Sequence, residues 1–193
     1  MDAGPVVSQT RRTLDGSEKA SELLSTLFDQ GTRELIAAMP AVFDGTVKTT
    51  PQDDAMATSA NKLCAADAKI DFSTMTASDI HNKVRGYDDW PGTYSTFTLV
   101  GREAEQGAPE PFRLKIITSV VLPGGRQGEL TKAVQLAKHD GKDVLRVVCS
   151  DGSALGLVEV QPVAKKIMGA KAYANGLVNS KADLHWAAPR EQD

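Results

Sequence analysis

Basic side chains that could hold phosphate groups gather at a few places in this sequence. Lys165 and Lys166 are adjacent, and they are the first candidates for phosphate contacts. Phosphate oxygens bind Lys and Arg side chains that cluster on one surface, as in nucleic-acid interfaces. The alternative is an ordinary solvated face whose charges are balanced by acids. Further candidates for the same chemistry are Lys171, Lys83, Arg85 and Lys115, with Arg113, Arg126 and Lys132 able to join them.

Histidines and cysteines, the usual metal ligands, are few and scattered. His81, His139 and His185 do not cluster with Cys64 or Cys149, and no C-x-x-C pair is present. This spacing argues against a zinc site or a disulfide scaffold, and it favours a reducing compartment. We expect His81 to be a packed or surface residue of a helix.

Two further residues invite a chemical interpretation. Asp2, taken from the residues alone, is typical of a turn or cap carboxylate. Trp90 precedes Pro91 and Gly92, and its ring could stack on a nucleic-acid base. A Trp directly before Pro-Gly more often anchors a turn onto the core, and we expect that role here.

Composition indicates a globular protein with no strong charge bias. The chain has 193 residues, 41% hydrophobic and 24% charged, with a net charge of −3. Its longest apolar run, residues 116–122, is too short to cross a membrane. Residues 1–57 hold five basic and nine acidic side chains, so their charge is −4, which leaves +1 for the rest. Nucleic-acid binding must therefore come from a local patch.

The acidic first part predicts helices that have no partner in their own segment. Asp15 and Ser17 are candidate N-caps, residues 23–28 and 35–43 carry apolar stripes, and Gly31 lies between the stripes. We expect two short helices, or one helix broken at Gly31, with Gly45 as the C-terminal stop. A short strand over residues 5–10 would precede them. Such helices need a covering partner, so we expect sequence upstream of residue 1; a short disordered start is the alternative.

The middle of the chain predicts a linker and then a capped helix. Residues 46–66 lack periodicity and are rich in Thr, Ala, Asp and Pro. Thr76 and Asp79 form a capping box, and Met75 can pack on Ile80. We expect a helix over residues 76–85 that ends at Gly86.

The last part of the chain predicts an antiparallel barrel. Asp140-Gly141 and Asp151-Gly152 are strong hairpin-turn sequences. Five short strands joined by tight turns are typical of an OB-type barrel. A short helix over residues 171–177 would follow, and residues 102–111 would form a loop. The expected strands cover residues 94–100, 112–122, 131–138, 143–149 and 154–160.

An ordered series of short motifs runs along nearly the whole chain. It comprises Met1-Asp2-Ala3-Gly4-Pro5, Gly45, Pro51-Gln52, Ala57-Thr58, Lys62-Leu63, Ile70-Asp71-Phe72, His81-Asn82-Lys83-Val84-Arg85-Gly86, Trp90-Pro91-Gly92-Thr93, Gln161-Pro162, Lys165-Lys166, Met168 and Asn175-Gly176. In this order and spacing the series resembles methionyl-tRNA formyltransferase, over the end of its catalytic domain and its whole C-terminal domain. The organellar forms of plants and algae are the most similar.

The resemblance implies an α+β architecture in three parts. Residues 1–48 would be helices remaining from a Rossmann-like formyltransferase catalytic domain. Residues 49–66 would be a linker. Residues 67–193 would form the OB-like antiparallel β-barrel with flanking helices, which binds tRNA.

The resemblance also implies an activity: transfer of a formyl group from 10-formyltetrahydrofolate to the amino group of methionyl initiator tRNA. Asp2 would be the catalytic aspartate, and the six basic candidates from Lys83 to Lys171 would contact the RNA. The family also uses an Asn and a His in an upstream segment and a folate-holding loop. This chain shows none of them, so we expect it to be inactive alone.

The resemblance further implies a monomer that binds initiator tRNA, with no membrane and no metal. It would work in a mitochondrion or plastid if eukaryotic, and in the cytoplasm if bacterial. Two alternatives remain open. One is a stand-alone, inactive tRNA-binding module. The other is the C-terminal part of a related formyltetrahydrofolate hydrolase or sugar formyltransferase.

Overall fold

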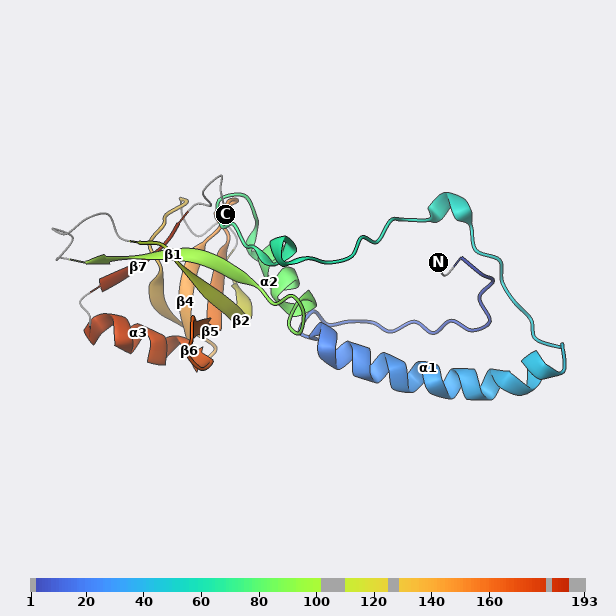
Figure 1. Ribbon diagram of the computed structural model, residues 1–193. Coiled ribbons are helices and arrows are strands. Elements are labelled where there is room, and N and C mark those ends of the chain that lie inside the picture. The colour runs from blue at the N-terminus through green and yellow to red at the C-terminus, as the bar shows by residue number, and fades with distance from the viewer. Residues whose placement is uncertain (1–2, 102–109, 125–128, 180–181, 188–193) are drawn as a thin grey trace. The chain divides into compact units, whose positions relative to one another are not determined.

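The computed structural model describes residues 3–101, 110–124, 129–179 and 182–187, and the chain forms two compact units. Unit 1 spans Met1–Leu63 and unit 2 spans Cys64–Asp193. Figure 1 shows the elements of both. None of the described helices is long and apolar enough to cross a membrane.

Unit 1 contains one long helix, α1 (Ala20–Phe43), and a short 3-10 helix, η1 (Asp54–Met56). The expected break at Gly31 is wrong, because α1 continues through this residue. A glycine inside a helix costs only about 1 kcal/mol, which good helix formers on both sides can offset. Gly45 does end the helix, with a left-handed φ of 67°.

The start of unit 1 also differs from expectation. Neither Asp15 nor Ser17 caps α1, since Lys19 holds the N-cap position and the Asp15 carboxylate accepts hydrogen bonds from Ser17 instead. The strand expected over residues 5–10 is reduced to one bridge, in which Val6 and Thr50 exchange two backbone hydrogen bonds. A single bridge of this kind is marginally stable, because a stable sheet needs more strands.

The apolar face of α1 is not covered within unit 1. None of its residues is buried, and Phe28 and Phe43 are 69% and 77% exposed. The helix therefore draws no stability from a packed core of its own.

Over its described residues, unit 2 is an antiparallel barrel with two α-helices. The strands run in the order β3-β4-β5-β2-β1-β7, and β6 pairs with β5. The sheet closes where residues 132–134 pair with β7: Val134 N donates to the Leu184 carbonyl, and Trp186 N donates to the Lys132 carbonyl, both at 2.9 Å. The elements of this unit are η2 (Ala65–Ala68), α2 (Ala77–Gly86), β1 (Tyr94–Gly101), β2 (Phe112–Leu122), β3 (Gln135–His139), β4 (Lys142–Val148), β5 (Ala154–Pro162), β6 (Met168–Gly169), α3 (Ala170–Asn179) and β7 (Ala182–Trp186).

The predicted α+β architecture with an OB-like antiparallel barrel is confirmed, with changes in detail. Residues 131–134 do not belong to β3, and residues 132–134 pair with β7 instead. Strands β6 and β7 were not predicted. The turn at Asp140-Gly141 has φ of 48° and 75° at its two residues, which is the expected type I′ geometry.

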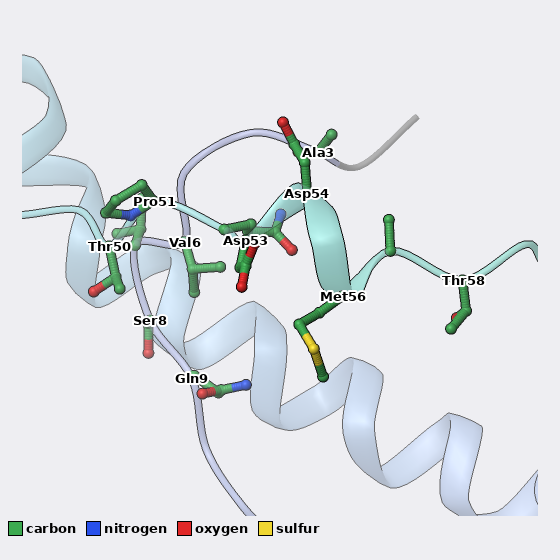
Figure 2. A pocket seen from close by; sticks show the side chains of 13 residues that line it. Ala3, Val6, Ser8, Gln9, Thr50, Pro51, Asp53, Asp54, Met56 and Thr58 are labelled. Atoms are coloured by element: carbon green, nitrogen blue, oxygen red, sulfur yellow. The ribbon is translucent and has the colours of Figure 1, made fainter.

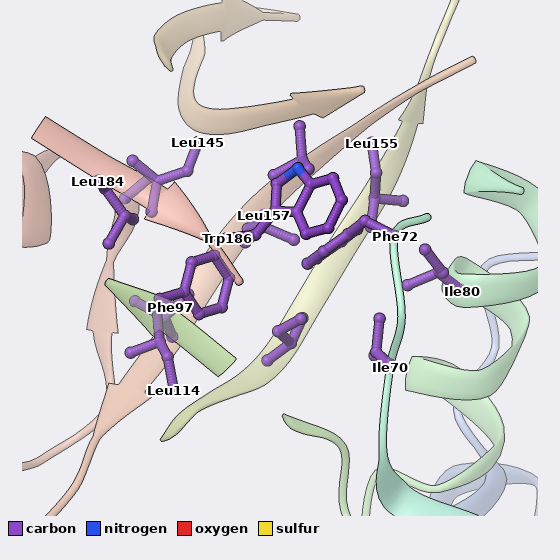
Figure 3. Close-up of a cluster of buried hydrophobic side chains, with 14 of the residues drawn as sticks. Ile70, Phe72, Ile80, Phe97, Leu114, Leu145, Leu155, Leu157, Leu184 and Trp186 are labelled. Carbon is purple, nitrogen blue, oxygen red and sulfur yellow. The ribbon is translucent and has the colours of Figure 1, made fainter. Parts of the chain in front are cut away.

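The core of unit 2 lies inside the barrel and under its two helices (Figure 3). The ring of Phe72 lies 6.0 Å from those of Phe97 and Trp186. Ile80 and Val84 of α2 are buried in the same cluster, and Met75 packs against it. The predicted capping box is present, because Thr76 and Asp79 each bond the other's backbone N–H. Helix α3 packs against β4 and β7 (Figure 1).

Candidate nucleic-acid interface

Residues from three neighbouring strands surround a hollow of about 320 Å³ on unit 2. We call this feature the basic hollow. Lys115 on β2 pairs with Tyr94 on one side and with Gln161 on the other, so the sheet register brings these strands' side chains together. The residues lining the basic hollow are Tyr94, Arg113, Lys115, Gln161, Pro162, Val163, Ala164 and Lys165.

A hydrogen-bonded turn over residues 162–165 forms one wall of the basic hollow. Lys165 N donates to the Pro162 carbonyl at 3.1 Å, and Gln161 Nε2 donates to the Lys165 carbonyl at 3.0 Å. Ala164 adopts a left-handed φ of 58°, which is uncommon for a residue other than glycine. Backbone held in such a conformation occurs often at functional sites. The turn therefore fixes the position of the Lys165 backbone.

The charge of the basic hollow has one sign. Arg113, Lys115 and Lys165 contribute three cations, and no carboxylate occurs among the described residues that line it. The guanidinium carbon of Arg113 lies 4.8 Å from the centre of the Tyr94 ring, a cation–π contact. The arrangement offers positive charge beside an aromatic and apolar surface, which suits an anion that carries a flat group.

Three of the predicted basic residues, Arg113, Lys115 and Lys165, line the basic hollow, and two others, Lys166 and Lys171, lie close by in sequence. Lys166 is exposed directly after the turn. Lys171 is exposed in the first turn of α3, which begins immediately after β6, and β6 pairs with β5. Neither lines the hollow.

Lys83 and Arg85, the two predicted basic residues on α2, form hydrogen bonds within the protein. Lys83 Nζ donates to the Lys69 carbonyl at 2.7 Å, and the side chain is half-buried. Burial lowers the pKa of Lys83, and the nearby Asp67 carboxylate opposes this shift. Arg85 donates from Nη2 to Asn82 Oδ1 at 2.8 Å. Neither residue lines the basic hollow.

The interpretation of Trp90 as a core anchor is wrong. Its side chain is 65% exposed, whereas Trp186 is 3% exposed and packs in the barrel. Trp186 also donates from Nε1 to the Thr131 carbonyl at 2.8 Å. The alternation of buried Leu184 and Trp186 around His185 was the pattern that could have revealed this.

His81 is packed, as expected. Its Nδ1 lies 3.1 Å from the hydroxyl oxygen of buried Ser119 on β2, so it joins α2 to the barrel. Within the described ranges, no three His, Cys, Asp or Glu side chains are grouped so that they could hold a metal ion.

A second hollow, of about 600 Å³, lies within unit 1 (Figure 2). It is lined by residues 50–54, 56–58, 3 and 6–9, without a histidine among them. The Asp53 carboxylate accepts a hydrogen bond from Ala55 N at 3.0 Å and so caps η1. Asp2, the predicted catalytic residue, lies outside the described residues, as do Arg126 and most of the predicted loop 102–111.

Sequence reasoning alone did not select Tyr94 or Gln161 for this interface. Tyr94 is the first residue of a predicted strand, and nothing in the sequence fixes its partner. The register that places it beside Lys115 depends on non-local pairing, so only a knowledge of that pairing would have brought the two together.

A family model described as "Formyl transferase, C-terminal domain" matches residues 62–178, which include the whole basic hollow. Among similar proteins, the methionyl-tRNA formyltransferase of Staphylococcus epidermidis is 28% identical over 180 residues, 93% of this chain and 52% of the relative.

Two other bacterial proteins of the same name are similar. That of Nitratidesulfovibrio vulgaris is 31% identical over 149 residues, 77% of this chain and 45% of its own length. That of Chloroflexus aurantiacus is 30% identical over 177 residues, 92% of this chain and 52% of its own length. The chain thus spans about half the length of the curated relatives it matches. Since the family model covers well over half of the chain, this protein belongs to the formyl transferase C-terminal domain family.

Proposed function

We propose that this chain provides the tRNA-binding part of a methionyl-tRNA formyltransferase. The reaction transfers a formyl group from 10-formyltetrahydrofolate to the amino group of methionyl initiator tRNA. The basic hollow carries the proposal, because it gathers three cations, with no carboxylate among the described residues that line it, and it lies within the region that matches the family. The shared name of the relatives supports the same substrate.

The RNA contacts divide into a direct group and a supporting group in this proposal. Lys115 and Lys165 bind phosphate oxygens at the basic hollow, and exposed Lys166 and Lys171 extend the positive surface. Lys83 and Arg85 act through the fold: Lys83 joins α2 to the Lys69 carbonyl at the end of η2, and Arg85 bonds Asn82 within α2.

The formyl transfer itself needs more than these residues. The amine that attacks must lose a proton to a base, and the developing oxyanion needs a donor. Asp2 takes the place of the family's active-site aspartate in this proposal. That aspartate works beside a histidine, and residues 3–63 contain no histidine. The described hollows hold no histidine, so the folate donor has no complete site among them, and the chain alone transfers no formyl group.

The test is the salt dependence of binding between the 193-residue chain and initiator methionyl-tRNA. The logarithm of the binding constant should fall linearly with the logarithm of salt concentration. Lys115→Glu and Lys165→Glu should each weaken binding and reduce the slope by about 1. Lys142→Glu is the matched control, because it makes the same charge change at an exposed residue outside the basic hollow.

Binding that ignores both salt and the identity of the tRNA would contradict the proposal. It would favour a related folate-using enzyme that shares the barrel but not the RNA. Salt-dependent binding without any formyl transfer, even after addition of the N-terminal half of a relative, would instead favour a stand-alone tRNA-binding module.

A further inference from the structure

We infer that the basic hollow holds a single unstacked nucleotide, with its base against the Tyr94–Arg113 pair and its phosphate between Lys115 and Lys165. The inference rests on the proposed function, since it takes RNA as the ligand. It goes further by naming the part of the RNA that enters and the residues that select it.

The size and lining of the basic hollow distinguish it from a plain phosphate contact. Surface lysines alone are enough to bind a backbone phosphate. The volume of about 320 Å³ lies at the lower end of the range for small-molecule pockets, about 300–1,000 Å³. Its lining includes an aromatic ring and three apolar residues, which a phosphate group alone does not need. These features suit a base attached to the phosphate.

The Tyr94–Arg113 pair provides planar surfaces for that base. Aromatic rings and guanidinium planes are the groups on which unpaired RNA bases stack. Arg113 already lies over the Tyr94 ring at 4.8 Å, so the pair presents a preformed stack. Exposed Val163 and its neighbours Pro162 and Ala164 add an apolar edge at the rim.

The frame around the basic hollow is preorganised. Three paired strands fix Tyr94, Lys115 and Gln161, and two hydrogen bonds fix the turn that leads to Lys165. A site that is ordered before binding loses less conformational entropy when the ligand arrives. A base inside a helix is covered by its neighbours on both faces, so only an unpaired nucleotide can enter.

The test uses the full 193-residue chain and uridine 5′-monophosphate, with inorganic phosphate as the comparison. Amide chemical shifts of Tyr94, Lys115, Gln161 and residues 163–165 should change with saturation as the nucleotide is added. Inorganic phosphate should bind the same residues at least tenfold more weakly. Equal binding of the two ligands would overturn the inference, because it would leave the base without a role.

Variants separate the aromatic surface from the charges. Tyr94→Leu should weaken nucleotide binding at least tenfold, whereas Tyr94→Phe should preserve it and show that the ring matters. Trp90→Leu is the control, since it removes another exposed aromatic ring. If Trp90→Leu abolishes binding and Tyr94→Leu does not, the site is elsewhere. Thermal unfolding of each variant checks that the barrel is intact.

The same variants separate this inference from the proposed function. If initiator tRNA binds with the expected salt dependence, but Tyr94→Leu and Arg113→Ala change neither affinity nor nucleotide binding, the single-nucleotide site is wrong and the RNA-binding role stands. If uridine 5′-monophosphate binds at Tyr94 while initiator tRNA does not bind, the site stands and the proposed function fails.

Discussion

The surroundings of Lys83 indicate that this residue stabilises the fold and does not contact RNA directly. Lys83→Met should lower the free energy of unfolding by about 1–2 kcal/mol, because the Lys69 carbonyl loses a charged donor at 2.7 Å. Lys165→Met should leave stability within about 0.5 kcal/mol, as is usual for an exposed side chain. Urea unfolding measures the stability of both variants, and tRNA binding shows which of them loses affinity. Equal loss of tRNA affinity in both variants would contradict this assignment.

Cys149 makes stability depend on alkaline pH. Burial, helped by the Asp151 carboxylate, raises the pKa of its thiol from 9.0 to about 12. Between these pH values the unfolded chain releases a proton that the folded chain keeps. The contribution of this thiol to the free energy of unfolding is therefore constant below about pH 9 and then falls by up to about 1.4 kcal/mol per pH unit. Burial also raises the pKa of Tyr173 to about 12, which acts in the same direction.

The measurement compares urea midpoints at pH 8, 9.5 and 10.5 in the wild type and in Cys149→Ala. The variant should lose less stability over this range than the wild type does. Identical losses would show that the thiol has an ordinary pKa in the folded state.

The residue types predicted some members of the candidate site, but strand pairing determines which of them lie together. Lys115 and Lys165 were selected because they are basic, but their meeting depends on the alignment of β2 with β5. Tyr94 was missed for the same reason. The role of Trp90 was misjudged because tertiary packing, not the adjacent Pro-Gly, decides which indole is buried.

At the scale of elements, β5 has no room for a side chain at Gly156. A Cβ there would lie 3.1 Å from Val120 Cγ1 and from Val144 Cβ and Cγ2. Gly156→Ala should therefore destabilise the protein by about 1–3 kcal/mol through overpacking. Gly176→Ala is the matched control: it lies in α3 with nothing within 4 Å, and it should stabilise by about 0.5–1 kcal/mol. Thermal unfolding of both variants tests this contrast.

The sequence predicted those elements whose stabilising contacts join residues close together in the chain. The capping box at Thr76 and the turn at Asp140-Gly141 are formed by residues close in sequence, and both were predicted correctly. Strand β7 was missed because Ala182 and Asp183 are poor strand formers. Its conformation comes from pairing on both edges, with β1 and with residues 132–134. Non-local pairing of this kind leaves little trace in a single sequence.

At the scale of the whole molecule, the two units should differ sharply in protection from hydrogen exchange. Strands β2 and β5 lie in a closed barrel and carry much of the core, whereas α1 has no buried residue. Amides of β2 and β5 should therefore exchange only by global unfolding, and those of α1 should exchange orders of magnitude faster. Native-state exchange on the 193-residue chain measures this. Equal protection in α1 would mean that its apolar face is covered in solution.

The closure of the barrel also sets an order of events during synthesis. Strand β7 comes after α3 in the chain, yet it pairs with β1 and with residues 132–134, both of which are made earlier. Until the chain through Trp186 has left the ribosome, both of these segments keep an unpaired backbone edge. Such edges are open to chaperones and to neighbouring nascent chains. The arrival of β7 removes both edges in one step, so a ribosome that stalls before Ala182 leaves the barrel open.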